Sequence, residues 1–241
     1  REHVWMWLWL CVRDGVASAV RELGSTPLIG FGGAPFTLAA YMVEGRPSRD
    51  HLAARALAAS DPGAWDALMS WCARVSADFI TSQVEAGASV AQLFDSWVGS
   101  LSPRTYRESV APYSRMVAQR VAGAVSPVTG ERAPLIHFGT GSAPILPDMA
   151  EVGADCVGVD WKTDLSWAVA QVPGKAVQGN LDPALLQAPW SVIEQAVRDI
   201  LDAGRSAPGH VFNLGHGVPP TTAPDVLTRI VELVRELGGS R

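Results

Sequence analysis

Short apolar runs alternate with longer amphipathic stretches along most of the chain, from about Ser25 to the end. The apolar runs are uncharged and often β-branched, which is typical of strands buried on both faces. We therefore predict six strands, at residues 27–31, 90–94, 135–138, 156–159, 176–178 and 211–213. Regular alternation of strands with helices indicates βαβ units and a parallel sheet.

Four of the amphipathic stretches predict helices. We expect them at residues 62–86, from 103 onward, at 189–202 and at 223–237. Asp61 and Ser102 precede prolines and are expected to cap the first two helices. Gly87 and Gly204 stand where glycines commonly end helices, so the sequence marks these element boundaries on its own.

Glycine and proline gather in the loops that follow the strands, whereas the loops before the strands are plainer. The clusters lie at residues 32–35, 139–144, 179–183 and 215–220. In a (β/α) barrel the loops after the strands form the active-site face. We therefore expect an α/β fold with a site at the carboxyl ends of its parallel strands.

The first fifteen residues fit neither pattern. Residues 4–12 are all apolar, with Trp5, Trp7 and Trp9 at alternate positions, so neither a helix nor a strand would gain a polar face. The run is shorter than the roughly 20 residues of a membrane span and lacks the flanks of a signal peptide. We expect residues 1–15 to be a separate segment, artefactual or translated out of frame, and residues 16–241 to be one partial barrel domain.

Composition narrows the class of function. The formal net charge is −5 and no basic block occurs, which argues against nucleic-acid binding. Cys11, Cys72 and Cys156 are far apart, without C-x-x-C spacing. This argues against a disulfide framework or a cysteine-based zinc site and favours a reducing, cytoplasmic environment.

The strand ends carry polar and aromatic residues but almost no cations, since Lys162 is the one nearby lysine or arginine. The segments read GFGGAPFTLAAYMVEG (30–45), QLFDSWVG (92–99), HFG (137–139), GVDW (158–161), QGNLDP (178–183) and NLGHG (213–217). Taken together and in this order, they closely resemble the uroporphyrinogen decarboxylase family, from about Val16 to the C-terminus.

The resemblance implies an α/β fold of the (β/α)8 TIM-barrel type that usually pairs as a homodimer. The implied reaction removes the carboxyl groups of four acetate arms from uroporphyrinogen, giving coproporphyrinogen, with no metal or organic cofactor. Decarboxylation needs a sink for the electron pair that the departing carboxyl group leaves behind, and a protonated pyrrole ring can be that sink. Such a site needs an anion near the pyrrole N–H groups and cations for the remaining carboxylates.

The resemblance also implies four substrate-binding residues. Phe31 would line the macrocycle, whereas Tyr41, Ser96 and His216 would hydrogen-bond substrate carboxylates. Simpler structural roles stay open: Phe31 as barrel core, Tyr41 as a helix residue with a solvated hydroxyl, Ser96 as a turn cap, and His216 as a structural histidine.

Other polar residues of the strand ends are expected to be structural. We expect Asp95 and Asp160 to hold backbone amides of loops, and His137 to be a satisfied core histidine. His3, His51 and His210 have no support from any motif.

The resemblance also has a gap. The family's two strand-end arginines and its aspartate facing the pyrrole N–H groups have no counterpart here, and the block at Pro27 corresponds to the family's third strand. Only units from the third onward are therefore expected, and six strands would leave two open edges. We expect a fragment, from a truncated gene, a partial sequence or a shifted reading frame, without the catalytic aspartate and substrate-binding arginines.

The sequence leaves three alternatives. A zinc-dependent corrinoid methyltransferase of the same superfamily would need His-x-Cys at a strand end, where this chain has His137, Phe138 and Gly139. A non-catalytic fragment would retain part of the substrate rim and the dimer face. A doubly wound sheet with a nucleotide site is disfavoured, because the glycines at residues 30–33 lack the required spacing.

Overall fold

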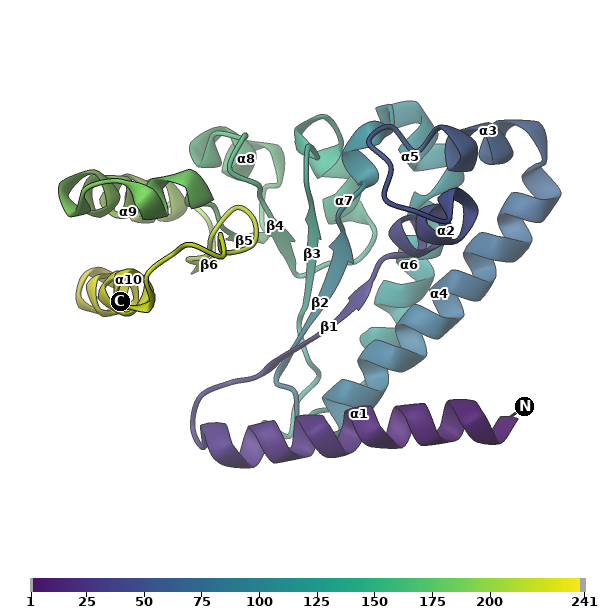
Figure 1. Cartoon of the computed structure of the whole chain (residues 1–241), viewed down its shortest axis with the longest axis horizontal. Helices are drawn as coiled ribbons and strands as arrows, with labels where there is room; N and C mark the ends of the chain where they lie inside the picture. Colours follow the sequence, from purple (N-terminus) through teal and green to yellow (C-terminus); the bar gives the residue numbers. More distant parts are fainter. Residues whose placement is uncertain (1, 239–241) are drawn as a thin grey trace.

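The sheet is parallel and follows the order of the sequence. The computed structural model describes residues 2–238, with side chains from Trp9 onward. The six strands pair in the order β1-β2-β3-β4-β5-β6, so each strand lies beside its neighbours along the chain (Figure 1). Their bounds are β1 Ile29–Gly33, β2 Val90–Asp95, β3 Leu135–Gly139, β4 Cys156–Gly158, β5 Ala176–Gln178 and β6 His210–Val211. All six predicted strands are confirmed, with the largest shift of two residues at β1 and β6.

Helices connect the strands throughout. The α-helices are α1 Glu2–Leu23, α2 Pro35–Glu44, α3 Leu52–Ser60, α4 Pro62–Glu85, α5 Pro103–Ser109, α6 Ala111–Val121, α7 Leu146–Glu151, α8 Leu165–Gln171, α9 Trp190–Gly204 and α10 Pro224–Gly238. Short 3-10 helices lie at Val98–Ser100, Ala143–Ile145 and Pro183–Gln187. This alternation confirms the α/β class and a fold of the βα-barrel type.

The predicted helix signals hold at three of four positions. The Asp61 carboxylate accepts from the Ala64 N–H at 2.9 Å, and the Ser102 hydroxyl accepts from the Thr105 N–H at 3.1 Å. Gly87 has φ +121°, a left-handed conformation at the end of α4. The expectation for Gly204 was wrong, because it is the last residue of α9 rather than the residue beyond it. A Cβ there would collide with the His210 ring, so close packing explains this glycine.

Helix α1 runs without a break across the predicted boundary between residues 15 and 16. The Trp9 ring packs against Phe79 of α4, with centroids 5.5 Å apart. The side chains of Trp5 and Trp7 lie outside the described residues. The division of the chain at this point therefore stays a prediction. None of the helices within residues 2–238 is long and apolar enough to cross a bilayer.

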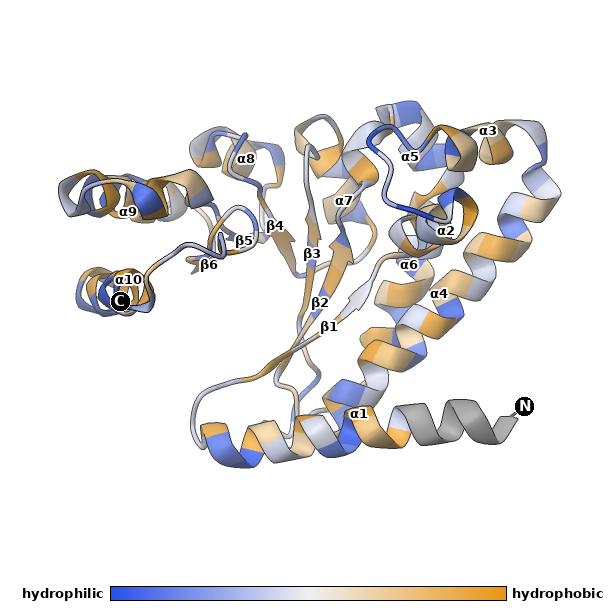
Figure 2. Ribbon diagram, viewed as in Figure 1, coloured by the Kyte–Doolittle hydropathy of each residue, from blue (hydrophilic) through white to orange (hydrophobic). Residues whose placement is uncertain are grey.

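The main core lies between the sheet and its helices, and the central strands are mostly hydrophobic (Figure 2). On β1, Gly30 and Gly32 face α4, whereas Ile29 and Phe31 are 39% and 56% exposed on the other face. A Cβ on Gly32 would lie 2.8 Å from Cγ1 of Ile80, so glycine allows α4 to approach the strand closely. Among the described residues β1 and β6 form the two edges of the sheet, and the face opposite the helices is open at both.

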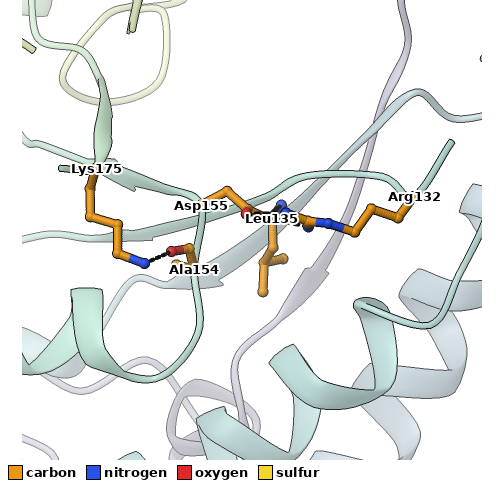
Figure 3. Close-up of polar contacts among 5 residues, drawn as sticks. All are labelled: Arg132, Leu135, Ala154, Asp155 and Lys175. Atoms are coloured by element: carbon orange, nitrogen blue, oxygen red, sulfur yellow. Dashed lines mark hydrogen bonds and ion pairs between the residues drawn. The ribbon is translucent and has the colours of Figure 1, made fainter. Parts of the chain in front are cut away.

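A polar network fixes the amino ends of β3, β4 and β5, at the end of the sheet away from the predicted site (Figure 3). The Asp155 carboxylate accepts two bonds from Arg132, at 2.6 and 2.9 Å, and one from the Leu135 N–H at 2.8 Å. Lys175 donates to the Ala154 carbonyl oxygen at 2.7 Å. The hydrogen bonds from Arg132 are the main cause that lowers the pKa of Asp155.

Candidate functional site

The predicted strand ends surround a cavity of about 410 Å³. Its lining combines apolar, amide, hydroxyl and imidazole side chains and contains no lysine, arginine, aspartate or glutamate among the described residues. The lining residues are Gln92, Phe94, Ser96, Phe138, Val159, Gln178, Asn213, Leu214, His216, Gly217 and Val218. We call this space the main cavity. An apolar pocket with a few convergent polar groups is the usual form of a ligand site.

A row of aromatic rings forms one wall. Phe94 and Phe138 pair across β2 and β3 and meet edge to face at 5.9 Å. Phe31 on β1 meets Phe94 in the same way at 5.6 Å, and its side chain is 56% exposed. Phe31 faces away from α4 on an edge strand of the sheet, so its roles as barrel core and as a contact of the macrocycle both stay open. The ring extends the wall beyond the residues that line the main cavity.

Two buried amides, which the sequence reasoning did not single out, lie at the base of the main cavity. Gln92 and Gln178 are 5% and 2% exposed, and Gln178 Nε2 lies 3.4 Å from Gln92 Oε1. Gln178 Oε1 is buried and has no hydrogen-bonding partner among the described residues. Both residues belong to strand-end motifs, QLFDSW and QGNLDP, so the sequence contained a signal that could have identified them as site residues. An unpaired amide oxygen can accept a hydrogen bond from a ligand N–H.

Two of the four predicted substrate-binding residues line the main cavity together. Ser96 follows β2, and His216 lies in the loop after β6. The His216 ring packs edge to face on Trp161, with centroids 5.4 Å apart. A Cβ on Gly215 would collide with the Trp161 backbone, so this glycine lets the loop that carries His216 lie close to the end of β4.

A second pocket of about 330 Å³ adjoins the first and shares Ser96 with it. Its lining residues are Ser48, Arg49, Asp50, His51, Arg55, Ser96, Trp97, Gly99, Ser100, Thr140, Gly141 and Lys162. We call it the cationic pocket. The expectation that Lys162 is the only cation near the strand ends was wrong, since Arg49 and Arg55 come from the segment after α2, outside the quoted motifs.

Tyr41 lies beside the cationic pocket rather than in the main cavity. Its ring stacks on Trp97 at 3.8 Å, and Trp97 in turn stacks on His51 at 4.4 Å. Tyr41 is 49% exposed. The structure therefore brings Ser96 and His216 together and leaves Phe31 and Tyr41 one ring away, each behind an aromatic residue that lines a pocket.

The buried acids behind the site differ in role. Asp160 accepts from the N–H groups of Gly141 and Lys162, at 2.6 and 3.2 Å, which confirms its expected role in holding loops. Asp95 instead accepts from the Thr37 hydroxyl at 3.1 Å. His137 is buried as expected, with Nε2 3.5 Å from Asp95 Oδ2. It was expected to be satisfied, yet both ring nitrogens lack a hydrogen-bonding partner among the described residues.

No cluster of three or more His, Cys, Asp or Glu residues within the described chain has the arrangement of a metal site. Cys156, the cysteine closest to a strand end, pairs with Ile136 rather than His137 in the sheet register. Burial raises the pKa of the Cys156 thiol to about 12. Cys156 is the first residue of β4, at the amino end of the strand, whereas the two pockets lie at the carboxyl ends, which disfavours the methyltransferase alternative.

The fold and the two pockets first define a class, an α/β protein of the βα-barrel type with a ligand site at the carboxyl ends of parallel strands. The model of the uroporphyrinogen decarboxylase (URO-D) family matches residues 10–237. The chain belongs to the uroporphyrinogen decarboxylase family.

Relatives named uroporphyrinogen decarboxylase are more than half identical to it. The protein from Arthrobacter sp. (strain FB24) is 55% identical over 227 residues, which cover 94% of this chain and 64% of the relative. The protein from Salinispora tropica is 54% identical, over 94% of this chain and 59% of the relative. The chain thus spans less than two thirds of the length of these relatives.

A solved structure supports the fold. A methyltransferase from Methanosarcina mazei superposes with a TM-score of 0.78 and 19% sequence identity, covering 94% of this chain and 64% of that chain. At this identity the likeness shows a shared fold alone.

Proposed function

We propose that the protein is a uroporphyrinogen decarboxylase, which converts uroporphyrinogen III to coproporphyrinogen III by removing the four acetate carboxyl groups. The observation that carries the proposal is the main cavity, because the family's own strand-end motifs supply Ser96 and His216 to one space. The 55% identity to a named decarboxylase supports the same reaction.

The residues of this chain would bind and orient the tetrapyrrole. Phe31, Phe94 and Phe138 offer apolar ring faces to the macrocycle. Ser96, Tyr41 and His216 would hydrogen-bond carboxylates of its arms. The amide oxygens of Gln178 and Asn213 would accept from pyrrole N–H groups. Holding the reacting arm in one orientation lowers the entropic part of the barrier.

The residues that line the main cavity do not complete the electron sink that decarboxylation requires. A protonated pyrrole is stabilised by a nearby anion, and the lining of the main cavity carries no carboxylate among the described residues. We infer that the present chain contributes substrate binding without the family's catalytic aspartate and arginines. We further propose that the full-length protein acts as a cytoplasmic homodimer, without metal, organic cofactor, nucleic-acid or membrane partner.

A decarboxylation assay on the 241-residue chain tests the proposed reaction and the non-catalytic role of this chain. The chain is incubated with uroporphyrinogen III without oxygen, and the products are oxidised and separated by carboxyl number. We expect retention of the substrate without conversion by the present chain, and conversion by a chain of the relatives' full length. Coproporphyrinogen formed by the present chain would contradict the non-catalytic role, and no conversion by the full-length protein would contradict the proposed reaction.

A further inference from the structure

We propose that the cationic pocket binds carboxylate groups of the same ligand whose ring occupies the main cavity. The ligand class is a small polycarboxylate with an uncharged core. Identifying those carboxylates as arms of a tetrapyrrole rests on the proposed function, whereas the carboxylate site itself rests on the charges and contacts below.

Three cations converge on a small volume. Arg49, Arg55 and Lys162 line the cationic pocket, against Asp50 as the one acidic lining residue of the described chain. Within residues 2–238 no carboxylate lies at ion-pair distance from any of the three. Arg55 donates instead to the Asp50 backbone carbonyl at 3.3 Å. The pocket therefore has uncompensated positive charge in a chain whose formal net charge is −5.

The segment that carries the arginines is held in place. The Glu44 carboxylate accepts from the N–H groups of Ala53 and Ala54, at 2.9 and 3.2 Å, which ties the end of α2 to the start of α3. The Ser48 hydroxyl accepts from the His51 N–H at 3.2 Å. A held segment presents its arginines without a large ordering cost on binding.

The pocket wall also contains an unpaired buried atom. His51 is 3% exposed, and its Nδ1 lies 3.2 Å from the Ser100 hydroxyl. Its Nε2 is buried and has no hydrogen-bonding partner among the described residues. Buried polar atoms are rarely left unpaired, so the wall has capacity for one more polar contact.

The two pockets adjoin at one shared residue, and a tryptophan links their contents. Ser96 lines both, and Trp161 lies between His216 of the main cavity, at 5.4 Å, and the Lys162 ammonium, at 5.0 Å from its ring centroid. An uncharged cavity next to a positively charged one fits a ligand with a neutral ring and anionic arms. Arginine binds carboxylates with paired hydrogen bonds, which makes the two arginines the main determinants.

A probe without a ring tests the carboxylate site independently of the reaction. Tricarballylate is titrated into the chain, and binding is followed by the NMR shifts of the arginine Nε–H groups and by calorimetry. We expect the Arg49 and Arg55 signals to move, and the double variant Arg49→Gln/Arg55→Gln to bind at least about tenfold more weakly. Both arginines are exposed, so circular dichroism should be unchanged.

The matched control is Arg120→Gln/Arg198→Gln, which removes the same charge from exposed positions of α6 and α9 that pair with acids. This variant should bind tricarballylate as the wild type does. Three results would each overturn the carboxylate site. Wild type and the Arg49/Arg55 variant could bind tricarballylate with equal affinity, or the control variant could lose as much affinity as the Arg49/Arg55 variant. The chain could also bind inorganic phosphate more tightly than tricarballylate.

A second titration, with uroporphyrin III, tests whether the carboxylates belong to a tetrapyrrole. We expect the Arg49/Arg55 variant to lose affinity about tenfold and to show a weaker dependence on NaCl concentration, because screened charges contribute less at high salt. An unchanged affinity and salt dependence would overturn this assignment. In a third outcome, tricarballylate binds but uroporphyrin III binds neither the wild type nor the variant. This result would contradict the proposed function and leave the carboxylate site intact.

Discussion

At the level of single residues, Gln178 is expected to contribute to ligand binding and not to the stability of the fold. Its amide oxygen is buried at the base of the main cavity without a partner, and its amide nitrogen makes only a long contact of 3.4 Å with Gln92. An unsatisfied buried acceptor weakens the fold and is tolerated where a ligand can satisfy it.

Replacing Gln178 with methionine keeps the length of the side chain and removes both polar atoms. We expect Gln178→Met to leave the free energy of unfolding unchanged or to raise it by up to about 1 kcal/mol, while affinity for uroporphyrin III falls about fivefold. Urea unfolding and fluorescence titration measure the two effects. Gln187→Met, at an exposed glutamine near Thr222, is the control and should change neither. A large loss of stability with unchanged affinity would assign Gln178 to the fold instead.

At the level of elements, α4 packs closely against β1. The missing side chain of Gly32 leaves room for Ile80, whose Cγ1 would be 2.8 Å from an added Cβ. We expect Gly32→Ala to lower the free energy of unfolding by about 1–3 kcal/mol, because the core must shift to admit the methyl group.

Gly63, in the first turn of α4, provides the matched control. An added Cβ there meets only the Asp61 carboxylate, at 3.5 Å. Gly63→Ala should be neutral or stabilising by up to about 1 kcal/mol, since alanine is the better helix former. Thermal unfolding compares the two variants, and equal effects would mean that β1 and α4 do not pack as closely as described.

The polar network at the amino ends of the strands gives the chain a dependence on pH. The pKa of Asp155 is lowered, chiefly by hydrogen bonds from Arg132. The stabilisation is therefore present above the carboxyl's unfolded pKa of about 3.9 and is lost as pH falls through the lower folded value.

We expect Asp155→Asn to lower the free energy of unfolding by about 1 kcal/mol at pH 7, allowing for partial exposure of the pair, and the difference to vanish well below pH 4. Urea unfolding at several pH values measures it. The exposed pair of Asp202 and Arg205 supplies the control variant Asp202→Asn, which should have little effect at any pH. A difference that grows toward low pH would contradict the role given to Asp155.

The elements were more predictable than the pockets. Buried strands have an uncharged, β-branched pattern, and caps such as Asp61 and Ser102 have local chemistry that sequence shows directly. The amino-terminal part of the helix over Glu2–Leu23 was not predicted because its apolar run has no polar face. The predicted helix after Ser102 divides at Val110 into α5 and α6, and Pro112 in the first turn of α6 is a local signal for this division that the sequence analysis did not use.

For the whole molecule, strand order determined which predicted residues meet. Ser96 and His216 could be placed together because both follow strands of one parallel sheet. Arg49 and Arg55 were missed because Arg49 lies in the loop between α2 and α3 and Arg55 lies in the first turn of α3, and the return of both to the strand ends depends on tertiary packing. Trp97 and Trp161 flank the two pockets, but their positions in the sequence have no periodicity or spacing that distinguishes a site residue from a core residue.

The central claim is that the strand ends of this chain hold an acidic tetrapyrrole, with its ring in the main cavity. A crystal structure of the chain grown with coproporphyrinogen III under anaerobic conditions tests it most directly, because this product keeps carboxylate arms and is not converted further by the proposed reaction. The account predicts electron density for the macrocycle against Phe94 and Phe138, next to Ser96 and His216. Density for the macrocycle elsewhere on the chain, or an empty cavity at saturating ligand, would contradict it.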